Sequence, residues 1–299
     1  MAVVVVGSAV SAQAVHLAKD IKLSHTVFAL PFALLATFLA AGGWPRTGQL
    51  GLIVLCMVTA RTVAMVANRL LDARLDGLNP RTRGRAIPSG RVSGGFAAAA
   101  MAASGAAFLA ACGGFYLAYG NPWPALLGPV VLAFLVAYPL MKRVTSLCHY
   151  YLGLALAAAP VCAWLAVSGE VGAGAWVLAG AVLMWTAGFD ILYASQDYAS
   201  DVQTGVFSVP ARLGLRRAFW VSRASHVVAG GLLLALPLAA PQLGWLYVAG
   251  ATAACVLLVV EHCIVSPDDL TRLNMAFFTL NGCVSLVVGT LGIVDVLAG

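Results

Sequence analysis

The chain has 299 residues, of which 62% are hydrophobic and only 9% are charged, and its formal net charge is +6. A soluble domain carries roughly 25% charged residues, so this composition excludes a soluble globular protein and indicates an integral membrane protein. The basic excess does not predict a nucleic-acid partner, because the basic residues gather in alternate connections between apolar segments.

Nine apolar segments are long enough to cross a bilayer, which takes about 20 helical residues each. In chain order they are residues 24–42, 49–71, 94–117, 124–141, 148–168, 173–194, 218–239, 243–261 and 274–297. Joints that contain Gly, Pro or charged residues separate them. The sequence therefore predicts an all-α integral membrane protein of nine transmembrane helices, with one domain over residues 1–299.

Alternate joints differ sharply in positive charge. With the N-terminus inside, the inside joints hold Lys19, Lys22, Arg74, Arg81, Arg83, Arg85, Arg91, Lys142, Arg143, Arg212, Arg216, Arg217, Arg223 and Arg272. The outside joints hold little beyond Arg46. Because Lys and Arg are in excess in cytoplasmic loops, we expect a multi-pass protein of the inner, cytoplasmic membrane with a cytoplasmic N-terminus and an external C-terminus.

The second predicted helix ends in an acidic segment, ARTVAMVANRLLDARLDG. Asn68, Asp72 and Asp76 are spaced i, i+4 and i+8, so on a continuous α-helix they drift by only about 80° and share one face. Arg61 lies on the same stripe about two turns deeper. An arginine inside a span is costly, so Arg61 either pairs with a neighbouring acid or binds an anionic substrate.

The sixth predicted helix ends in a second acidic segment, GFDILYASQDYASDVQTG at residues 188–205. Its aspartates Asp190, Asp197 and Asp201 fall within roughly 40° of one another on a continuous helix. Each acidic segment is followed by a loop that contains a proline. The resemblance between the two acidic segments and their following loops suggests an internal duplication. It would divide the chain into two four-helix halves, about 20–145 and 146–262, followed by a final helix at 274–297.

Five clustered carboxylates repel one another unless a cation lies among them. A set of oxygen ligands favours Mg²⁺ or Ca²⁺ over zinc, and Mg²⁺ is commonly completed by phosphate oxygens. The basic residues nearby suit the same anion; they are Arg81, Arg83, Arg85, Lys142 and Arg143. The pattern thus predicts a Mg²⁺ site for a lipid diphosphate at the membrane surface.

Other interpretations of the acids remain open. They could be solvated residues at helix ends, and the arginines could serve only as topology signals. A secondary transporter also has buried acids and two related halves. A phosphotransferase of the CDP-alcohol type is disfavoured, because Asp76-Gly77 continues Leu-Asn-Pro-Arg and so lacks that family's D-G-x-x-A-R signature.

Several motifs together resemble the UbiA superfamily of intramembrane aromatic prenyltransferases. They are the N-x-x-x-D-x-x-x-D segment from Asn68 to Asp76, the D-x6-D-x3-D segment from Asp190 to Asp201, NPRTRGRAIPSGRVS at 79–93 and AYPLMKRVTSLCHYYLG at 137–153. They occur in order over nearly the whole chain. Further stretches, such as HTVFALPFALLA at 25–36, are similar to the bacterial branch of 4-hydroxybenzoate type.

The resemblance implies a fold of nine helices around a cavity that opens to lipid. It implies that a polyprenyl group is transferred from a polyprenyl diphosphate to an aromatic acid, with Mg²⁺ as cofactor, for ubiquinone or menaquinone biosynthesis. We expect the acceptor to be 4-hydroxybenzoate, with 1,4-dihydroxy-6-naphthoate as the alternative. Haem O, chlorophyll and glyceryl-phosphate prenylation are further activities within the superfamily.

The resemblance also implies roles for individual residues. Those expected to bind Mg²⁺ and diphosphate are Asp72, Asp76, Asp197 and Asp201, supported by Asn68 and Asp190. Those expected to hold phosphate oxygens are Arg85, Lys142 and Arg143. Tyr193 would line the cavity near the reacting carbon, and Arg61 is our candidate for the carboxylate of the acceptor.

Overall fold

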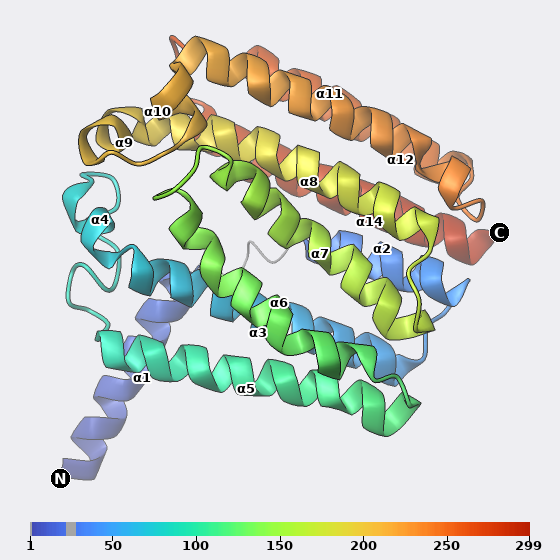
Figure 1. The fold of residues 1–299 in the computed structure, drawn as a ribbon, viewed down its shortest axis with the longest axis horizontal. Helices are drawn as coiled ribbons and strands as arrows, with labels where there is room; N and C mark the ends of the chain where they lie inside the picture. The colour runs from blue at the N-terminus through green and yellow to red at the C-terminus, as the bar shows by residue number, and fades with distance from the viewer. Residues whose placement is uncertain (1, 22–27) are drawn as a thin grey trace.

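The chain is almost entirely helical in the computed structural model, which describes residues 2–21 and 28–299 (Figure 1). Within these described residues, eight helical segments are long and apolar enough to cross a membrane, and α2 (Leu30–Ala41) is a shorter apolar helix. The first predicted span, 24–42, begins outside the described residues and ends in α2. The expectation of an all-α, multi-pass membrane fold is confirmed.

The helices after α2 that are long enough to cross a membrane follow the predicted segments closely, whereas the helix at Ala2–Asp20 and the short helices after each acidic segment lie outside them. The elements besides α2 come in this order. They are α1 (Ala2–Asp20), α3 (Thr47–Leu71), α4 (Ala73–Leu78), α5 (Gly94–Tyr119), α6 (Trp123–Met141), α7 (Cys148–Ser168), α8 (Ala173–Ala194), η2 (Ser195–Asp197), α9 (Tyr198–Thr204), α10 (Val209–Leu213), α11 (Leu215–Ala239), α12 (Trp245–Ile264), α13 (Leu273–Met275), η3 (Ala276–Leu280) and α14 (Asn281–Ala298).

Both acidic segments bend where the sequence predicted a continuous helix, so that expectation was wrong in detail. Helix α3 ends at Leu71, and the short helix α4 begins after Asp72. Helix α8 ends at Ala194, and a single 3₁₀ turn, η2, separates it from α9. The bends place the last acids of each segment on short helices at one end of the bundle.

The long helices run side by side along the long axis of the molecule, and α4, α9 and α10 lie together at its left end in Figure 1. Helix α8 packs between α7 and α11, α3 packs on α5, and α12 packs on α14. Helices α3, α6 and α7 also contact one another. Helices α3 and α8, which lead into the two acidic segments, therefore pack mainly against different neighbours.

Helices α7 and α8 approach each other very closely. A Cβ atom added at Gly153 of α7 would lie 2.4 Å from the carbonyl oxygen of Leu183 in α8, a distance that no side chain can occupy. Small residues permit such close backbone packing of helices in a membrane. The glycine therefore fixes the distance between the two helices just beneath the second acidic segment.

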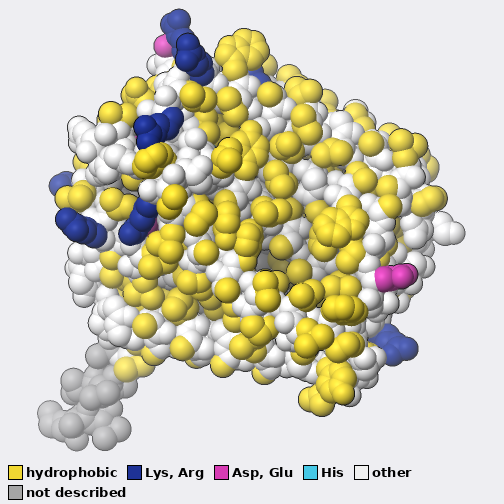
Figure 2. Space-filling view, viewed as in Figure 1, with side chains coloured by type: hydrophobic (Ala, Val, Ile, Leu, Met, Phe, Trp, Pro, Cys, Tyr) yellow, Lys and Arg dark blue, Asp and Glu magenta, His cyan; other side chains and the backbone are white. Residues whose placement is uncertain are grey.

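Exposed aromatic and basic side chains mark the two ends of the bundle. Trp44, Trp123, Trp176 and Trp245 are exposed and lie at or near the first residues of α3, α6, α8 and α12. Tryptophan is enriched at membrane–water interfaces. Figure 2 shows a broad hydrophobic face, with most of the visible Lys and Arg gathered along its left side, at the end that holds α4 and α9.

A buried polar network joins helices away from the acidic segments. The indole of Trp185 donates to Asn281 Oδ1 at 2.6 Å, and the Asn281 amide donates to Glu261 Oε1 at 2.8 Å. In the same half of the molecule, Asp295 Oδ2 accepts the backbone N–H of Gly244 and of Tyr247, at 2.5 and 3.1 Å. Asp295 thus caps α12, whose first N–H groups have no partner within the helix.

Candidate active site

A cavity of about 800 Å³ lies between α3, α6, α7 and α8. Its wall is polar where α4 and α9 meet it and apolar along most of its remaining length, where Ile53, Leu127 and Ala163 are among the lining residues. The predicted site residues that line it are Arg61, Asn68, Asp72, Asp76, Arg85, Lys142, Asp190, Tyr193, Asp197 and Asp201. The fold therefore brings both acidic segments to one end of a largely apolar space.

Asp72 lies at the junction of α3 and α4, and its side chain is only 1% exposed. The Lys142 ammonium donates to its carboxylate at 2.7 Å, and Arg143 Nη2 lies 3.4 Å from the other oxygen. Arg143 also donates to the carbonyl oxygen of Leu71 and does not line the cavity. A buried carboxylate needs such partners because burial alone penalises its charge.

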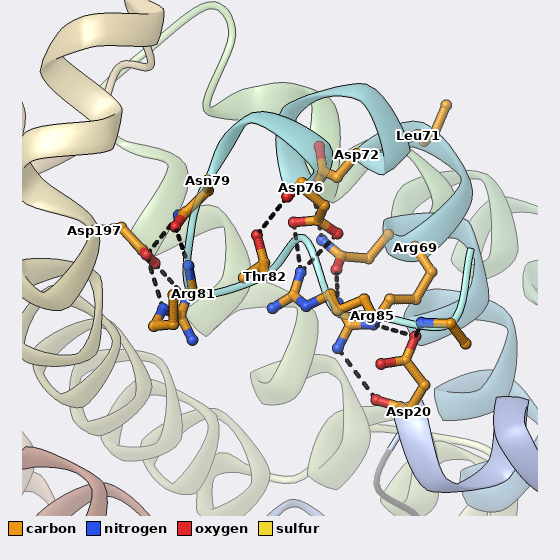
Figure 3. A network of polar contacts seen from close by, with 12 residues as sticks. Asp20, Arg69, Leu71, Asp72, Asp76, Asn79, Arg81, Thr82, Arg85 and Asp197 are labelled. Atoms are coloured by element: carbon orange, nitrogen blue, oxygen red, sulfur yellow. Dashed lines mark hydrogen bonds and ion pairs between the residues drawn. The ribbon is translucent and has the colours of Figure 1, made fainter. Parts of the chain in front are cut away.

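Asn68 and Arg69, near the end of α3, also orient the Asp72 carboxylate. Asn68 Nδ2 donates to Asp72 at 2.9 Å, and Arg69 Nη1 donates to Asn68 Oδ1 at 2.6 Å, so the amide is held at both of its ends. Arg69 in turn lies against Asp20, the last residue of α1, with its Nε 3.5 Å from the carboxylate (Figure 3). The acid of α3 is therefore oriented by a chain of polar groups that reaches α1.

Asp76 lies on α4 and faces Arg85 from the loop that follows. Arg85 Nη1 donates to both oxygens of the Asp76 carboxylate, at 2.7 and 2.8 Å. Thr82 in the same loop donates to the backbone carbonyl oxygen of Asp76 at 3.1 Å. The loop therefore folds back on α4 and holds the guanidinium group of Arg85 beside the Asp76 carboxylate.

Asp197 is bound by the same loop from across the cavity. Arg81 donates to it through Nε at 2.8 Å and through Nη2, while Asn79 Nδ2 donates at 2.7 Å (Figure 3). Burial by itself would lower the pKa of the Arg81 guanidinium, but the hydrogen bonds and charge of Asp197 outweigh burial, so this pKa is raised. Arg81 is therefore a permanent cation between the two acidic segments.

The remaining two aspartates of the second segment have partners that carry no permanent charge. Ser208 Oγ donates to Asp201 at 2.8 Å and also caps α10 by accepting the N–H of Ala211. Asp190 lies deeper, on α8, with one carboxylate oxygen 2.7 Å from Nδ1 of His149 in α7. These two carboxylates thus differ electrostatically from Asp72, Asp76 and Asp197, which each contact a lysine or an arginine.

Aromatic groups and Arg61 surround the cavity below the acids. The rings of Tyr193 and Phe277 lie 4.1 Å apart between centroids, and the Tyr193 hydroxyl accepts from Arg81 at 3.3 Å. Arg61 lines the same cavity, and its Nη2 donates to the carbonyl oxygen of Ile21 at 3.1 Å. An aromatic wall with a cation nearby suits an aromatic acid or an electron-poor carbon.

The donor chemistry of the four aspartates fits Mg²⁺. All of their ligating atoms are carboxylate oxygens, which Mg²⁺ prefers. Within the described part of the chain, no three His, Cys, Asp or Glu side chains stand close enough to form a metal cage. Mg²⁺ does not require one, because it usually keeps several waters and is held by one or two carboxylates together with substrate phosphates.

Sequence reasoning missed four residues that the structure places in this site: Asp20, Asn79, His149 and Ser208. Arg81 was noted only as one of several basic residues. The one available signal was His149, because an ionisable residue at the edge of an apolar run is uncommon in membrane helices. The others lie in loops or at helix ends, where no periodic pattern predicts which side chains meet.

Comparison with known proteins gives a consistent result. The UbiA prenyltransferase family model matches residues 29–282. The 4-hydroxybenzoate octaprenyltransferase of Aliivibrio fischeri (strain MJ11) is 35% identical over 181 residues, which are 60% of this chain and 61% of that protein. The aligned part therefore spans less than two thirds of that relative.

Solved structures of other proteins share the fold. The apo structure of a UbiA homolog from Aeropyrum pernix K1 is 31% identical, with a TM-score of 0.82 over 92% of this chain and 99% of that chain. A UbiA homolog from Archaeoglobus fulgidus, bound to DMAPP and Mg²⁺, is 17% identical, with a TM-score of 0.63 over 92% of this chain and 99% of that chain. The second likeness is one of fold alone.

Proposed function

Because the chain belongs to the UbiA prenyltransferase family, we propose that it transfers a prenyl group from an allylic polyprenyl diphosphate to an aromatic acid. The acceptor we assign is 4-hydroxybenzoate, the substrate in the name of the Aliivibrio fischeri relative. The product would be a precursor of a membrane quinone. The alternative acceptor is 1,4-dihydroxy-6-naphthoate, which would use the same chemistry for menaquinone.

One observation carries this proposal. Two acid-bearing segments, Asp72 with Asp76 and Asp197 with Asp201, line the same end of a cavity whose remaining wall is largely apolar. Such a space can hold a charged head at one end and a hydrocarbon chain along its length. A transporter would not need four carboxylates interleaved with Arg81, Arg85 and Lys142 at the membrane surface.

The cofactor we propose is Mg²⁺, held with the diphosphate by Asp72, Asp76, Asp197 and Asp201. The Archaeoglobus fulgidus homolog was solved with Mg²⁺ and a prenyl diphosphate, which supports this assignment. When bound, the ion would supply positive charge that stabilises the leaving diphosphate. Asn68 would orient Asp72, to which it already donates a hydrogen bond.

The basic residues of the site would exchange partners when substrate binds. Lys142, Arg85 and Arg81 now contact the carboxylates of Asp72, Asp76 and Asp197, respectively. The carboxylates would turn to the metal, and these three cations would turn to the phosphate oxygens, which accept bidentate hydrogen bonds from arginine. The donor C–O bond would then break with its developing negative charge already balanced.

The side chains that line the cavity would keep water away from the allylic cation and direct the acceptor towards it. Apolar side chains exclude water, which would otherwise capture the cation. Tyr193 lines the cavity beside Phe277, and its ring would offer a π surface to the reacting carbon. Arg61 would bind the carboxylate of the acceptor and so direct the electron-rich ring carbon, ortho to the hydroxyl, towards the donor.

We also propose the orientation of the protein. The acidic segments lie at the end of the bundle rich in lysine and arginine, and the exposed tryptophans Trp123, Trp176 and Trp245 mark the starts of helices at the other end. Positive loops face the cytoplasm. The site would therefore open towards the cytoplasmic side of the inner membrane.

The test is a prenyl-transfer assay with protein in nanodiscs. Geranyl diphosphate and Mg²⁺ are mixed with 4-hydroxybenzoate or with 1,4-dihydroxy-6-naphthoate, and the products are identified by mass spectrometry. Prenylated 4-hydroxybenzoate, absent with EDTA and in Asp72→Asn, supports the proposal in full. Product with the naphthoate alone supports the chemistry and changes the acceptor. No Mg²⁺-dependent product with either acceptor would contradict the proposal.

A further inference from the structure

His149 is fixed at both of its ring nitrogens. Its side chain is 3% exposed, Nδ1 lies 2.7 Å from Oδ2 of Asp190, and the backbone N–H of Val209 points to Nε2 at 3.2 Å. A nitrogen that accepts a hydrogen bond from an amide carries no proton itself. The ring is therefore neutral, with its one proton on Nδ1, and it donates that proton to the Asp190 carboxylate.

Three separate elements hold this pair in place. Histidine is on α7 and aspartate on α8, which Gly153 brings into very close contact one turn further along α7. Val209 begins α10, directly after the capping residue Ser208. Neither partner can turn away without breaking a buried hydrogen bond, so the orientation of Asp190 is determined by the fold rather than by its own rotamer.

Asp190 differs from the acids that we assign to the diphosphate in position and in partner. It precedes Asp197 by seven residues and so lies roughly 10 Å deeper in the cavity. Its side chain is 24% exposed and lines the cavity beside Phe189 and Tyr193. Among the described residues its hydrogen-bond partner is this histidine, whereas Asp72, Asp76 and Asp197 each contact lysine or arginine.

A carboxylate beside a permanent cation is a poor base, because the cation favours its ionised form. Asp190 contacts no lysine or arginine among the described residues, and the hydrogen bond from His149 holds its carboxylate in one orientation at the cavity wall. Prenyl transfer to an aromatic ring needs a base. When the new C–C bond forms, the attacked ring carbon still carries its hydrogen and must lose it as a proton before the ring is aromatic again.

We propose that Asp190 accepts the proton that leaves the acceptor ring and that His149 is its positioning residue; this inference rests on the proposed function. The donor C–O bond breaks and its electron pair leaves with diphosphate. The ring carbon bonds to the allylic carbon. The C–H electrons of that carbon return to the ring, and its proton passes to Asp190, which later releases it to water.

The test uses acceptor deuterated at the two ring carbons ortho to the hydroxyl, with the whole chain in nanodiscs. In wild type we expect C–O cleavage to limit the rate, so that deuteration of the acceptor has no effect on kcat. In His149→Leu we expect kcat to fall about tenfold to a hundredfold, the cost of a hydrogen bond to a charged group, and a normal primary isotope effect to emerge. Asp190→Asn should lose about 10²–10⁴-fold.

Two variants separate positioning from general damage. His149→Gln keeps an N–H for Asp190 and an oxygen for Val209, so it should restore kcat and abolish the isotope effect. Tyr150→Phe removes a partly buried hydrogen bond to Ser225. Tyr150 is the next residue of α7 and does not line the cavity, so this variant should show no isotope effect. Diphosphate release without acceptor should be unchanged in Tyr150→Phe.

The opposite pattern would overturn the inference. If His149→Leu raised KM for the donor alone, with no isotope effect, the histidine would serve only to support the Ser208–Val209 turn and thereby Asp201. If Asp190→Asn kept wild-type kcat, the proton would go elsewhere. A wild-type protein that prenylated neither acceptor would instead remove the proposed function, and this failure is visible before any variant is measured.

Discussion

Arg81 binds Asp197 through two guanidinium nitrogens, although 116 residues separate them in the chain. Asn79, from the same loop, donates a third hydrogen bond to this carboxylate. The loop after the first acidic segment is thereby tied to the second acidic segment. A guanidinium that passes from a carboxylate to a metal-bound diphosphate keeps the charge of the site balanced throughout.

Replacing Arg81 should weaken binding of the donor. In Arg81→Ala we expect KM for geranyl diphosphate to rise about tenfold to a hundredfold, because a hydrogen bond to a charged group contributes roughly 1.5–3 kcal/mol. KM for the acceptor should not change. The matched control is Arg83→Ala, which removes an exposed arginine of the same loop. Equal donor KM values in the two variants would rule out this role.

Mg²⁺ and the donor should stabilise the protein together. A ligand that binds only the folded state raises the melting temperature by mass action. We expect a clear rise with Mg²⁺ plus a geranyl thiolodiphosphate analogue and little rise with either alone, measured by thermal unfolding in detergent. EDTA should reverse it. If both Asp76→Asn and Asp197→Asn showed the same rise in melting temperature as wild type, the ligand would bind elsewhere.

Arg61 should determine whether the acceptor needs a carboxylate. Arg61→Ala should raise KM for 4-hydroxybenzoate by about tenfold or more, since a charged hydrogen bond is lost, and leave KM for the donor unchanged. The preference of the enzyme for 4-hydroxybenzoate over phenol should fall by a similar factor. If the variant kept that preference, another group would bind the carboxylate.

Asp295 should affect stability without affecting catalysis. It caps α12 by accepting two backbone N–H groups and does not line the cavity. Loss of a capping side chain costs about 0.5–2 kcal/mol, so Asp295→Ala should lower the melting temperature. KM for both substrates should remain at the wild-type values. A changed acceptor KM in this variant would show that α12 is coupled to the site.

Much of the fold follows from composition and periodicity alone. Apolar runs of about 20 residues can only be buried or span a membrane, so the long helices from α3 onward were readable within a few residues. Helix α1 was not predicted. The spacing of Asn68, Asp72 and Asp76 predicted a shared direction, and all three line the cavity. The division into two four-helix halves stays a prediction.

The contacts within the site could not be read from the sequence for physical reasons. Loop arginines have no periodic spacing, and Arg81, Arg83 and Arg85 look alike until the path of the loop brings two of them to Asp197 and Asp76. The partners of His149 lie 41 and 60 residues away. The bend at Asp72 could not be predicted from the sequence either, because no glycine or proline lies at this position.

The central claim is that the two acidic segments together hold one metal-bound diphosphate. The most direct measurement is a calorimetric titration of geranyl thiolodiphosphate into protein in nanodiscs, with and without Mg²⁺, for wild type, Asp76→Asn and Asp201→Asn. We predict one Mg²⁺-dependent site in wild type and binding at least about tenfold weaker in each variant. Binding that needs no Mg²⁺, or that survives intact in both variants, would contradict the account.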